Sequence, residues 1–296
     1  MVNLAELQLY IQAYPVIFVV FIAVLSLIIG SFLNVVIYRL PKMMENEWQQ
    51  EYQQYFAPDN ASAAPVATFN LAVPRSACPH CQAPVQARDN IPLLSWLWLK
   101  GKCRHCSAPI SARYPVVELL TAVLSAAIAW QFGFGVLAAV LIVTTWLLIA
   151  LTFIDIDKML LPDQLTLPLL WLALLFSLSD SALVNAEQAI IGAAAGYLSL
   201  WSVYWLFKLL TGKEGMGYGD FKLLAVFGAL LGWQQLPLII LLSSCVGAVT
   251  GVILLSVQGK DKATPIPFGP YIAAAGWIAL LWGEQLTSAY LRYLGV

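Results

Sequence analysis

Charged residues are scarce in this chain. Of its 296 residues only 10% are charged, 60% are hydrophobic, and the formal net charge is −1. A chain with so little charge cannot form the surface of a soluble globule, so the composition predicts an integral membrane protein. The 15 lysines and arginines stand mostly singly and form no basic stripe, which argues against nucleic-acid binding.

The first apolar run, 15–38, lacks the features of a signal peptide. Glu6 rather than a basic cluster precedes it, and no small-residue cleavage signature follows it. We therefore expect a retained membrane anchor, with Arg39 and Lys42 at its cytoplasmic end. Asn34, near this end, is expected to support helix packing beside Gly30 rather than catalysis.

Eight apolar segments are candidates for crossing the bilayer. They cover residues 15–38, 114–131, 136–154, 165–178, 189–209, 221–233, 236–257 and 268–286. Segment 221–233 is short enough to be tilted, to thin the bilayer locally or to be partly re-entrant. If the first segment starts outside, fourteen of the 15 basic residues lie at cytoplasmic loops or helix ends and only Arg292 lies outside.

The predicted fold is therefore an all-α polytopic membrane protein with about eight transmembrane helices. Residues 1–38 form the anchor, 39–113 a cytoplasmic domain, and 114–296 a seven-helix membrane domain. Within the cytoplasmic domain, 44–56 is predicted to be a helix with an aromatic stripe that lies on the membrane or against a neighbouring module. A partner site is the alternative for this stripe. Residues 57–73 are predicted to be a linker.

Four of the five cysteines form two closely spaced pairs. The pairs are CPHC, with Cys78 and Cys81, and CRHC, with Cys103 and Cys106, and 21 residues separate them. Two such turns can complete a tetrahedron of thiolates around one metal ion, which predicts a zinc module at 78–106. Because four thiolates close the coordination sphere, the zinc is expected to be structural rather than catalytic.

Alternatives to a four-thiolate site remain open. Two disulfides would also use the four cysteines, but the basic residues around the loop predict a reducing cytoplasmic location that disfavours them. Both histidines of the chain, His80 and His105, lie inside the pairs, and either one would be a substitute ligand. The fifth cysteine, Cys245, stands in an apolar run and is interpreted as a buried small hydrophobe.

Two acidic residues stand where apolar segments meet the cytoplasm. Asp220 lies in the sequence EGMGYGDFK, and Asp155 lies in FIDIDKMLLPD. Acids in such places are costly and therefore suggest a function. Two neighbouring carboxylates cannot both ionise cheaply, so one keeps a proton and the pair can serve as general acid and base on a water molecule. The alternative is a pair of interfacial acids that bind Lys158 or Lys222.

Other acids compete for the catalytic role. Asp157 is two residues from Asp155 and should point in a different direction on a helix. Asp163 follows a proline and precedes a new span, so we expect it to cap a helix. It is also the second candidate, after Asp155, for the catalytic role. Glu118 lies one turn into the second span. It either lines the cavity that would hold the two catalytic acids, or it binds Arg113 or interfacial water.

Several motifs together resemble the bacterial type IV prepilin leader peptidases and N-methyltransferases, a group of GxGD-type membrane aspartic proteases. The motifs are GSFLNVVIYRLP, the two cysteine pairs around NIPLLSWLWLKGKC, ISARYPVVELLTA, FIDIDKMLLPDQLTLPLLW, GMGYGDFKLLA and PFGPYIAAAG. The match runs from about residue 30 to 276, and only 44–73 lacks a recognisable motif.

This resemblance implies a bifunctional enzyme of the bacterial inner membrane, with both termini periplasmic and the zinc loop and active site cytoplasmic. It would cut the basic leader from prepilins and pseudopilins after a glycine and methylate the new N-terminus with S-adenosylmethionine. Asp220 would be the GxGD acid and Asp155 its partner. No Rossmann-type glycine-rich helix start is found, so the methyl donor's binding residues are not predicted.

Two rival functions differ in kind from an enzyme. A cation-coupled transporter would need carboxylates spread across the depth of the bilayer, whereas the acids of this chain gather at one interface. A zinc-stabilised scaffold of a secretion machine would have acids that are only interfacial. The oligomeric state is not predicted.

Overall fold

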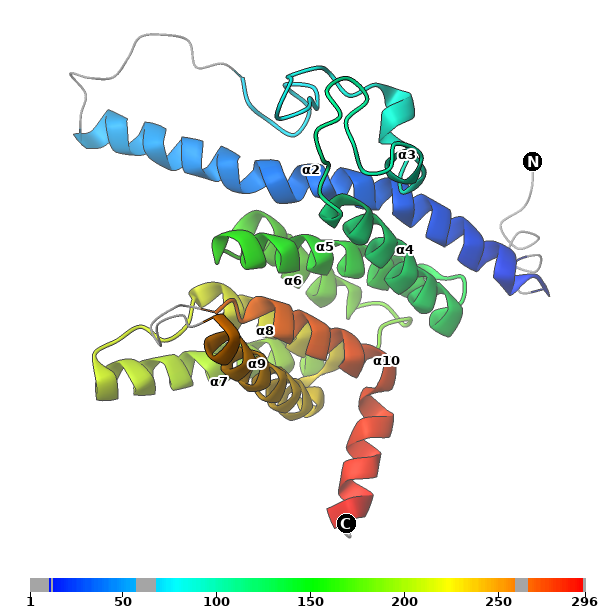
Figure 1. Ribbon diagram of the computed structural model, residues 1–296. Helices are drawn as coiled ribbons and strands as arrows, with labels where there is room; N and C mark the ends of the chain where they lie inside the picture. The colour runs from blue at the N-terminus through cyan, green and yellow to red at the C-terminus, as the bar shows by residue number, and fades with distance from the viewer. Residues whose placement is uncertain (1–10, 12, 57–67, 259–265, 295–296) are drawn as a thin grey trace. The chain divides into compact units, whose positions relative to one another are not determined.

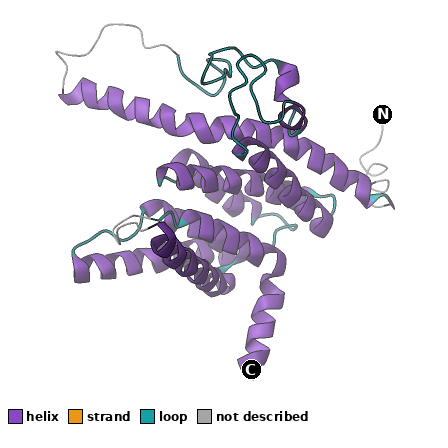
Figure 2. Ribbon diagram, viewed as in Figure 1, coloured by secondary structure: helices purple, strands orange, loops and turns teal. Residues whose placement is uncertain are grey.

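The computed structural model describes residues 11, 13–56, 68–258 and 266–294. Its regular elements are all helical, and the described residues contain no strand (Figure 2). The chain divides into two compact units, residues 1–133 and 134–296. An all-α fold is therefore confirmed. Lys260, Lys262 and most of the predicted linker lie outside the described residues.

Helix α2, Pro15–Phe56, joins two segments that the sequence predicted separately (Figure 1). At 1.5 Å per residue its 42 residues reach about 60 Å, roughly twice the thickness of the hydrocarbon core of a bilayer. Pro41 lies within the helix and is buried. The proposed anchor and the aromatic helix after it therefore form one continuous rod.

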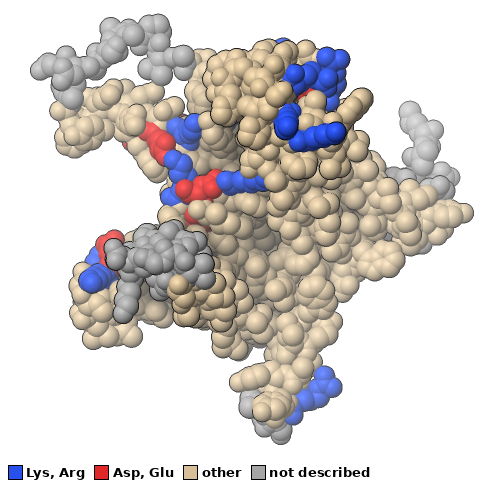
Figure 3. Space-filling model, in the orientation of Figure 1, with Lys and Arg blue, Asp and Glu red and all other residues tan. Residues whose placement is uncertain are grey.

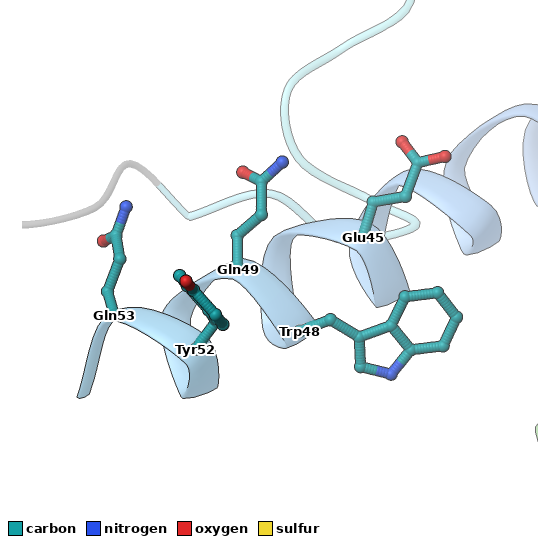
Figure 4. Close-up of a pocket in the computed structure, with 5 residues that line it drawn as sticks. All are labelled: Glu45, Trp48, Gln49, Tyr52 and Gln53. Carbon is teal, nitrogen blue, oxygen red and sulfur yellow. The ribbon is translucent and has the colours of Figure 1, made fainter. Parts of the chain in front are cut away.

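The aromatic part of α2 is exposed. Trp48, Tyr52, Tyr55 and Phe56 are 51% to 79% exposed, and the rings of Tyr52 and Phe56 lie 5.2 Å apart. Figure 4 shows Trp48 and Tyr52 on this part of the helix, with Glu45 close by in a shallow pocket. The helix predicted at 44–56 is thus confirmed, and its stripe is free of tight packing.

Helix α4, Arg113–Phe132, packs closely against the membrane part of α2. A Cβ atom at Gly30 would lie 2.8 Å from Cα of Glu118, so only glycine permits this approach. Asn34 donates from Nδ2 to the carbonyl oxygens of Gly30 (3.3 Å) and Tyr114 (3.1 Å). The expectation that Asn34 supports helix packing is confirmed.

The described residues of the second unit form six longer helices. They are α5 (Val136–Lys158), α6 (Asp163–Phe176), α7 (Ala186–Thr211), α8 (Tyr218–Leu231), α9 (Leu236–Gln258) and α10 (Gly269–Leu294). Every α8 residue from Asp220 to Leu230 except Lys222 is buried. A helix that is apolar all round belongs in a protein core, which accounts for the shortness of the predicted sixth span.

Helices α7 and α8 meet through glycines. A Cβ atom at Gly192 would lie 2.0 Å from the carbonyl oxygen of Gly228, and one at Gly228 equally close to the carbonyl of Gly192. Small residues that let backbones touch are typical of helix pairs in membranes.

Five described helices are long and apolar enough to cross a membrane: four of them are α2, α4, α5 and α7, and the fifth covers Trp233–Ile253. Helix α6 is a shorter apolar helix. Charged side chains occupy small patches of the face in Figure 3, and most of that face carries none. The five helices support a multi-pass membrane protein, while the full number of eight spans stays a prediction.

Candidate active site and cysteine cluster

Asp155 lies in the last turn of α5. It is 5% exposed, whereas Asp157 is exposed, as expected for residues two apart on one helix. Its Oδ2 atom accepts a hydrogen bond of 3.0 Å from the backbone N–H of Gly269, the first residue of α10. The carboxylate is thus buried and held by a second helix.

Asp220 lies in the first turn of α8, three residues after the N-cap residue Gly217. The N–H of Gly217 donates a hydrogen bond to its carboxylate, which is one of the two hydrogen bonds of a capping box. Asp220 is 7% exposed and feels the Coulombic repulsion of Asp155. Two buried carboxylates from segments 65 residues apart (220 − 155) therefore lie within electrostatic reach.

Leu161, in the turn between α5 and α6, fills the space beside both acids. A Cβ atom at Gly219 would lie 2.6 Å from Cβ of Leu161, and one at Gly269 would lie 3.1 Å from its Cδ1. Gly269 in turn touches Asp155, and Gly219 directly precedes Asp220. The end of α5 and the starts of α8 and α10 thus converge around one leucine.

Asp163 is not the helix cap that the sequence suggested. Helix α6 starts at Asp163, its N-cap residue is Pro162, and no side chain caps it. The exposed carboxylate instead pairs with Lys222, whose Nζ lies 2.6 Å from Oδ1. Since Lys222 is next but one to Asp220 in sequence yet binds Asp163, the structure gives this lysine a partner other than Asp220.

The loop before Asp220 is held by an ion pair. Lys208 Nζ lies 2.8 Å from Oε1 of Glu214, and its ammonium holds the pKa of Glu214 below the usual range. The rings of Tyr204, Tyr218 and Phe221 pack together at centroid distances of 5.3 to 5.7 Å. Aromatic packing and one ion pair therefore fix the two ends of the GYGD turn.

The four paired cysteines come together in the first unit. All four Sγ atoms lie within 4.8 Å of one another, with Cys78 to Cys106 at 3.8 Å and Cys81 to Cys103 at 4.0 Å. A tetrahedral zinc with bonds of about 2.3 Å requires sulfurs about 3.8 Å apart, whereas a disulfide requires about 2.05 Å. The donor set fits a tetrahedral metal ion, and neither histidine belongs to it.

Each cysteine pair sits in the same kind of turn. Cys78 N–H donates to Ala83 O and Cys103 N–H to Ala108 O, at 2.9 and 2.8 Å. In the first turn, N–H groups of Cys81 and then His80 lower the pKa of Cys78 to about 6. Backbone amides that favour thiolates prepare such a turn for a metal cation.

In the second turn, the pKa values of the two cysteines shift in opposite directions. N–H groups of Cys106 and then His105 lower the pKa of Cys103. The N–H of Ala108 also favours a charged Cys106, but burial and the hydrogen bonds of the other thiols raise its pKa to about 12. The backbone N–H groups therefore favour the thiolate form most clearly at Cys78 and Cys103.

Comparison with known proteins supplies the family. The type IV leader peptidase family matches residues 141–252, and the bacterial peptidase A24 N-terminal domain matches residues 24–132. A prepilin leader peptidase/N-methyltransferase of Aeromonas hydrophila is 62% identical over 268 residues, which cover 90% of this chain and 91% of the relative. This chain belongs to the type IV leader peptidase family.

Other members of the family agree along nearly their whole length. The relatives of the same name from Stutzerimonas stutzeri and Pseudomonas aeruginosa are 55% and 54% identical. The matches cover 96% and 97% of this chain, and 97% and 98% of the relatives. No solved structure matches the chain.

Some contacts of the site in this family member were not predicted. Glu118 accepts the N–H of Leu93 at 2.8 Å and a hydrogen bond from the side chain of Ser31. It therefore ties the loop between the cysteine pairs to α2 and α4. The repeated pattern CxHCxAP was a visible signal for the twin cysteine turns, whereas nothing in the sequence indicated the contact of Gly269 with Asp155.

Proposed function

We propose that this protein is a prepilin leader peptidase and N-methyltransferase of the bacterial inner membrane, with Asp155 and Asp220 as its catalytic acids. Family membership supports the two activities. The observation that carries the residue assignment is the approach of two buried carboxylates from different helices, near enough to repel each other.

Such a pair can cleave a peptide without a covalent intermediate. One carboxylate is ionised and takes a proton from a water molecule, whose oxygen attacks the carbonyl carbon of the scissile bond. The partner carboxylic acid gives its proton to the departing amide nitrogen. The carbon–nitrogen bond breaks, leaving a carboxylic acid on the leader and a free amine on the pilin.

The place of the acids suits a substrate held in the membrane. Asp155 ends an apolar helix and Asp220 begins one, so both lie where a helix end meets the membrane surface. A prepilin or pseudopilin with one apolar helix would present the bond at the base of its leader at this depth. We place the acids, both cysteine pairs and their loop in the cytoplasm, and both termini in the periplasm, because this arrangement puts fourteen of the 15 basic residues inside.

The second activity uses the amine that cleavage produces. S-adenosylmethionine would supply an electrophilic methyl group: the amine nitrogen would bond to the methyl carbon as the carbon–sulfur bond breaks, releasing S-adenosylhomocysteine and a proton. The described residues contain no strand and hence no Rossmann-type turn for an adenosyl group, so we assign no residue to its binding.

For the cysteine cluster we propose a structural zinc ion held by Cys78, Cys81, Cys103 and Cys106. The sulfur separations and the two matching turns support this proposal. Four thiolates leave no position for a substrate, so the ion would stabilise the loop rather than take part in hydrolysis.

The test uses the full-length protein purified in detergent and a synthetic prepilin peptide that spans the leader junction. Mass spectrometry should find cleavage without added S-adenosylmethionine, and cleavage followed by a gain of one methyl group when it is added. An intact peptide under both conditions would refute the peptidase, and a transporter or scaffold would give this result. Cleavage without methylation would refute only the second activity.

A further inference from the structure

The first turn of α10 has one main-chain donor directed at Asp155. Phe268 O accepts the N–H groups of Tyr271 and Ile272, at 3.1 and 3.2 Å. Pro270 has no N–H. In this described turn, Gly269 is left with an N–H that has no partner within its own helix, and it donates to Oδ2 of Asp155 at 3.0 Å. The side chain of Asp155 thus caps the N-terminus of α10, because it accepts an N–H that the helix itself leaves without an acceptor.

This contact offsets an unfavourable position of Asp155. The carboxylate lies in the last turn of α5, where the helix end carries a partial negative charge of about half a unit. The start of α10 carries the opposite partial charge. Because the N–H of Gly269 belongs to that positive end, it stabilises the ionised carboxylate where its own helix does not.

The contact also requires a residue without a side chain. A Cβ atom at position 269 would lie 2.7 Å from Oδ2 of Asp155 and 3.1 to 3.2 Å from the δ-carbons of Leu161. Asp155 and Leu161 are both buried, so neither can move aside freely. Any larger residue must therefore push the carboxylate away from the N–H or shift the start of α10.

We propose that Gly269 is a positioning residue for peptide cleavage. Its N–H fixes the carboxylate plane of Asp155, so that Oδ1 keeps one position relative to Asp220 and the attacking water. This inference rests on the proposed catalytic role of the two acids.

The test compares Gly269→Ala with Gly247→Ala in the full-length protein. A Cβ atom at Gly247 would lie 3.3 Å from the ring of Tyr271, so this control disturbs the same first turn without touching Asp155. We expect Gly269→Ala to lower kcat for cleavage by roughly 10- to 100-fold, the effect of misplacing a catalytic group by about 1 Å, with KM nearly unchanged. The control should cleave like the native protein.

Two further measurements separate positioning from damage to the fold. The loss in Gly269→Ala should appear in kcat and not in KM across a series of peptides that bind with different affinity, because a displaced carboxylate slows the chemical step without changing how the peptide binds. Methylation of a pre-cleaved peptide should proceed at the native rate. If Gly269→Ala does not fold, incorporation of glycolic acid at position 269 replaces the N–H by an ester oxygen without adding a Cβ atom, and the same loss of kcat is expected.

An Asp155→Asn variant is assayed alongside. Cleavage by Gly269→Ala or the glycolic-acid variant at the native rate, with Asp155→Asn inactive, would overturn the positioning role and leave the acid pair intact. Full cleavage by Asp155→Asn would instead overturn the proposed function. Equal loss in Gly269→Ala and Gly247→Ala would show that packing of the turn, rather than the hydrogen bond, matters.

Discussion

The two glycines of the GYGD turn should respond very differently to alanine. A Cβ atom at Gly219 would lie 2.6 Å from Cβ of Leu161, and ordinary contact begins at 3.4 Å, so the turn must move by 0.8 Å (3.4 − 2.6). A Cβ atom at Gly217 would have no neighbour closer than 3.9 Å, and its φ of −83° suits any residue. Of these two glycines, only Gly219 lies where a larger side chain would clash with its neighbour.

Because Gly219 directly precedes Asp220, the movement displaces one of the two proposed catalytic acids. A misplacement of about 1 Å costs roughly 100-fold in rate, so we expect cleavage by Gly219→Ala to fall by about that factor. Gly217→Ala should stay within about threefold of the native rate, since its change adds only a small cost at a helix cap, under about 1 kcal/mol. Initial rates on one prepilin peptide provide the comparison.

A second substitution tests the cause of the loss. Leu161→Gly removes the Cβ atom that obstructs position 219, whereas Leu161→Ala keeps it. Combined with Gly219→Ala, the first should restore part of the rate and the second should not. Equal activity of the Gly217 and Gly219 variants, or equal rescue by both changes of Leu161, would refute the steric explanation.

Three further predictions concern other parts of the molecule. Cys103→Ser should lower the zinc bound per chain, measured by elemental analysis, and speed proteolysis of the loop between the cysteine pairs; unchanged zinc content would contradict the four-thiolate site. The lowered pKa of Glu214 means that its ion pair stabilises the loop fully above the ordinary glutamate pKa of about 4.3, and that this stabilisation is lost as the pH falls through the lower pKa of the folded protein. Glu214→Gln should therefore speed hydrogen exchange of loop amides at pH 7, with a difference that shrinks as the pH is lowered below about 4, and equal exchange at pH 7 would oppose this. Gly30→Leu should separate α2 from α4, since a Cβ atom there would lie 2.8 Å from Cα of Glu118. It should lower the melting temperature far more than Val24→Leu, which changes a residue on the exposed face of α2. Equal melting temperatures of the two variants would contradict the close packing.

The parts of this fold that depend on local pattern were predictable. Apolar runs of the right length mark the helices, and the CxxC spacing marks a cluster whose four sulfurs do lie within 4.8 Å. Asp155 and Asp220 were candidates because acids at the ends of apolar segments are costly unless they serve a purpose; the structure buries both, and their catalytic role stays a prediction.

The sequence was less informative about features that depend on tertiary packing. The apolar pattern of 15–38 and the aromatic pattern of 44–56 did not predict that the two segments join into one helix, although Pro41, a residue type that usually interrupts a helix, lies between them. Asp163 was interpreted as a cap because it follows a proline, yet its partner Lys222 is 59 residues away. The donor to Asp155 is the main-chain N–H of Gly269, 114 residues away in the sequence. Because every residue except proline has such an N–H, the residue type does not predict this contact.

Cleavage by single asparagine variants of the two acids tests the assignment most directly. Asp155→Asn and Asp220→Asn keep the size of the side chains but remove general acid and base function, which typically contributes about 10² to 10⁴ in rate. Each purified variant should lose cleavage of the prepilin peptide by at least about 100-fold while it still methylates a pre-cleaved peptide. Native cleavage rates in either variant would contradict catalysis by the acid pair.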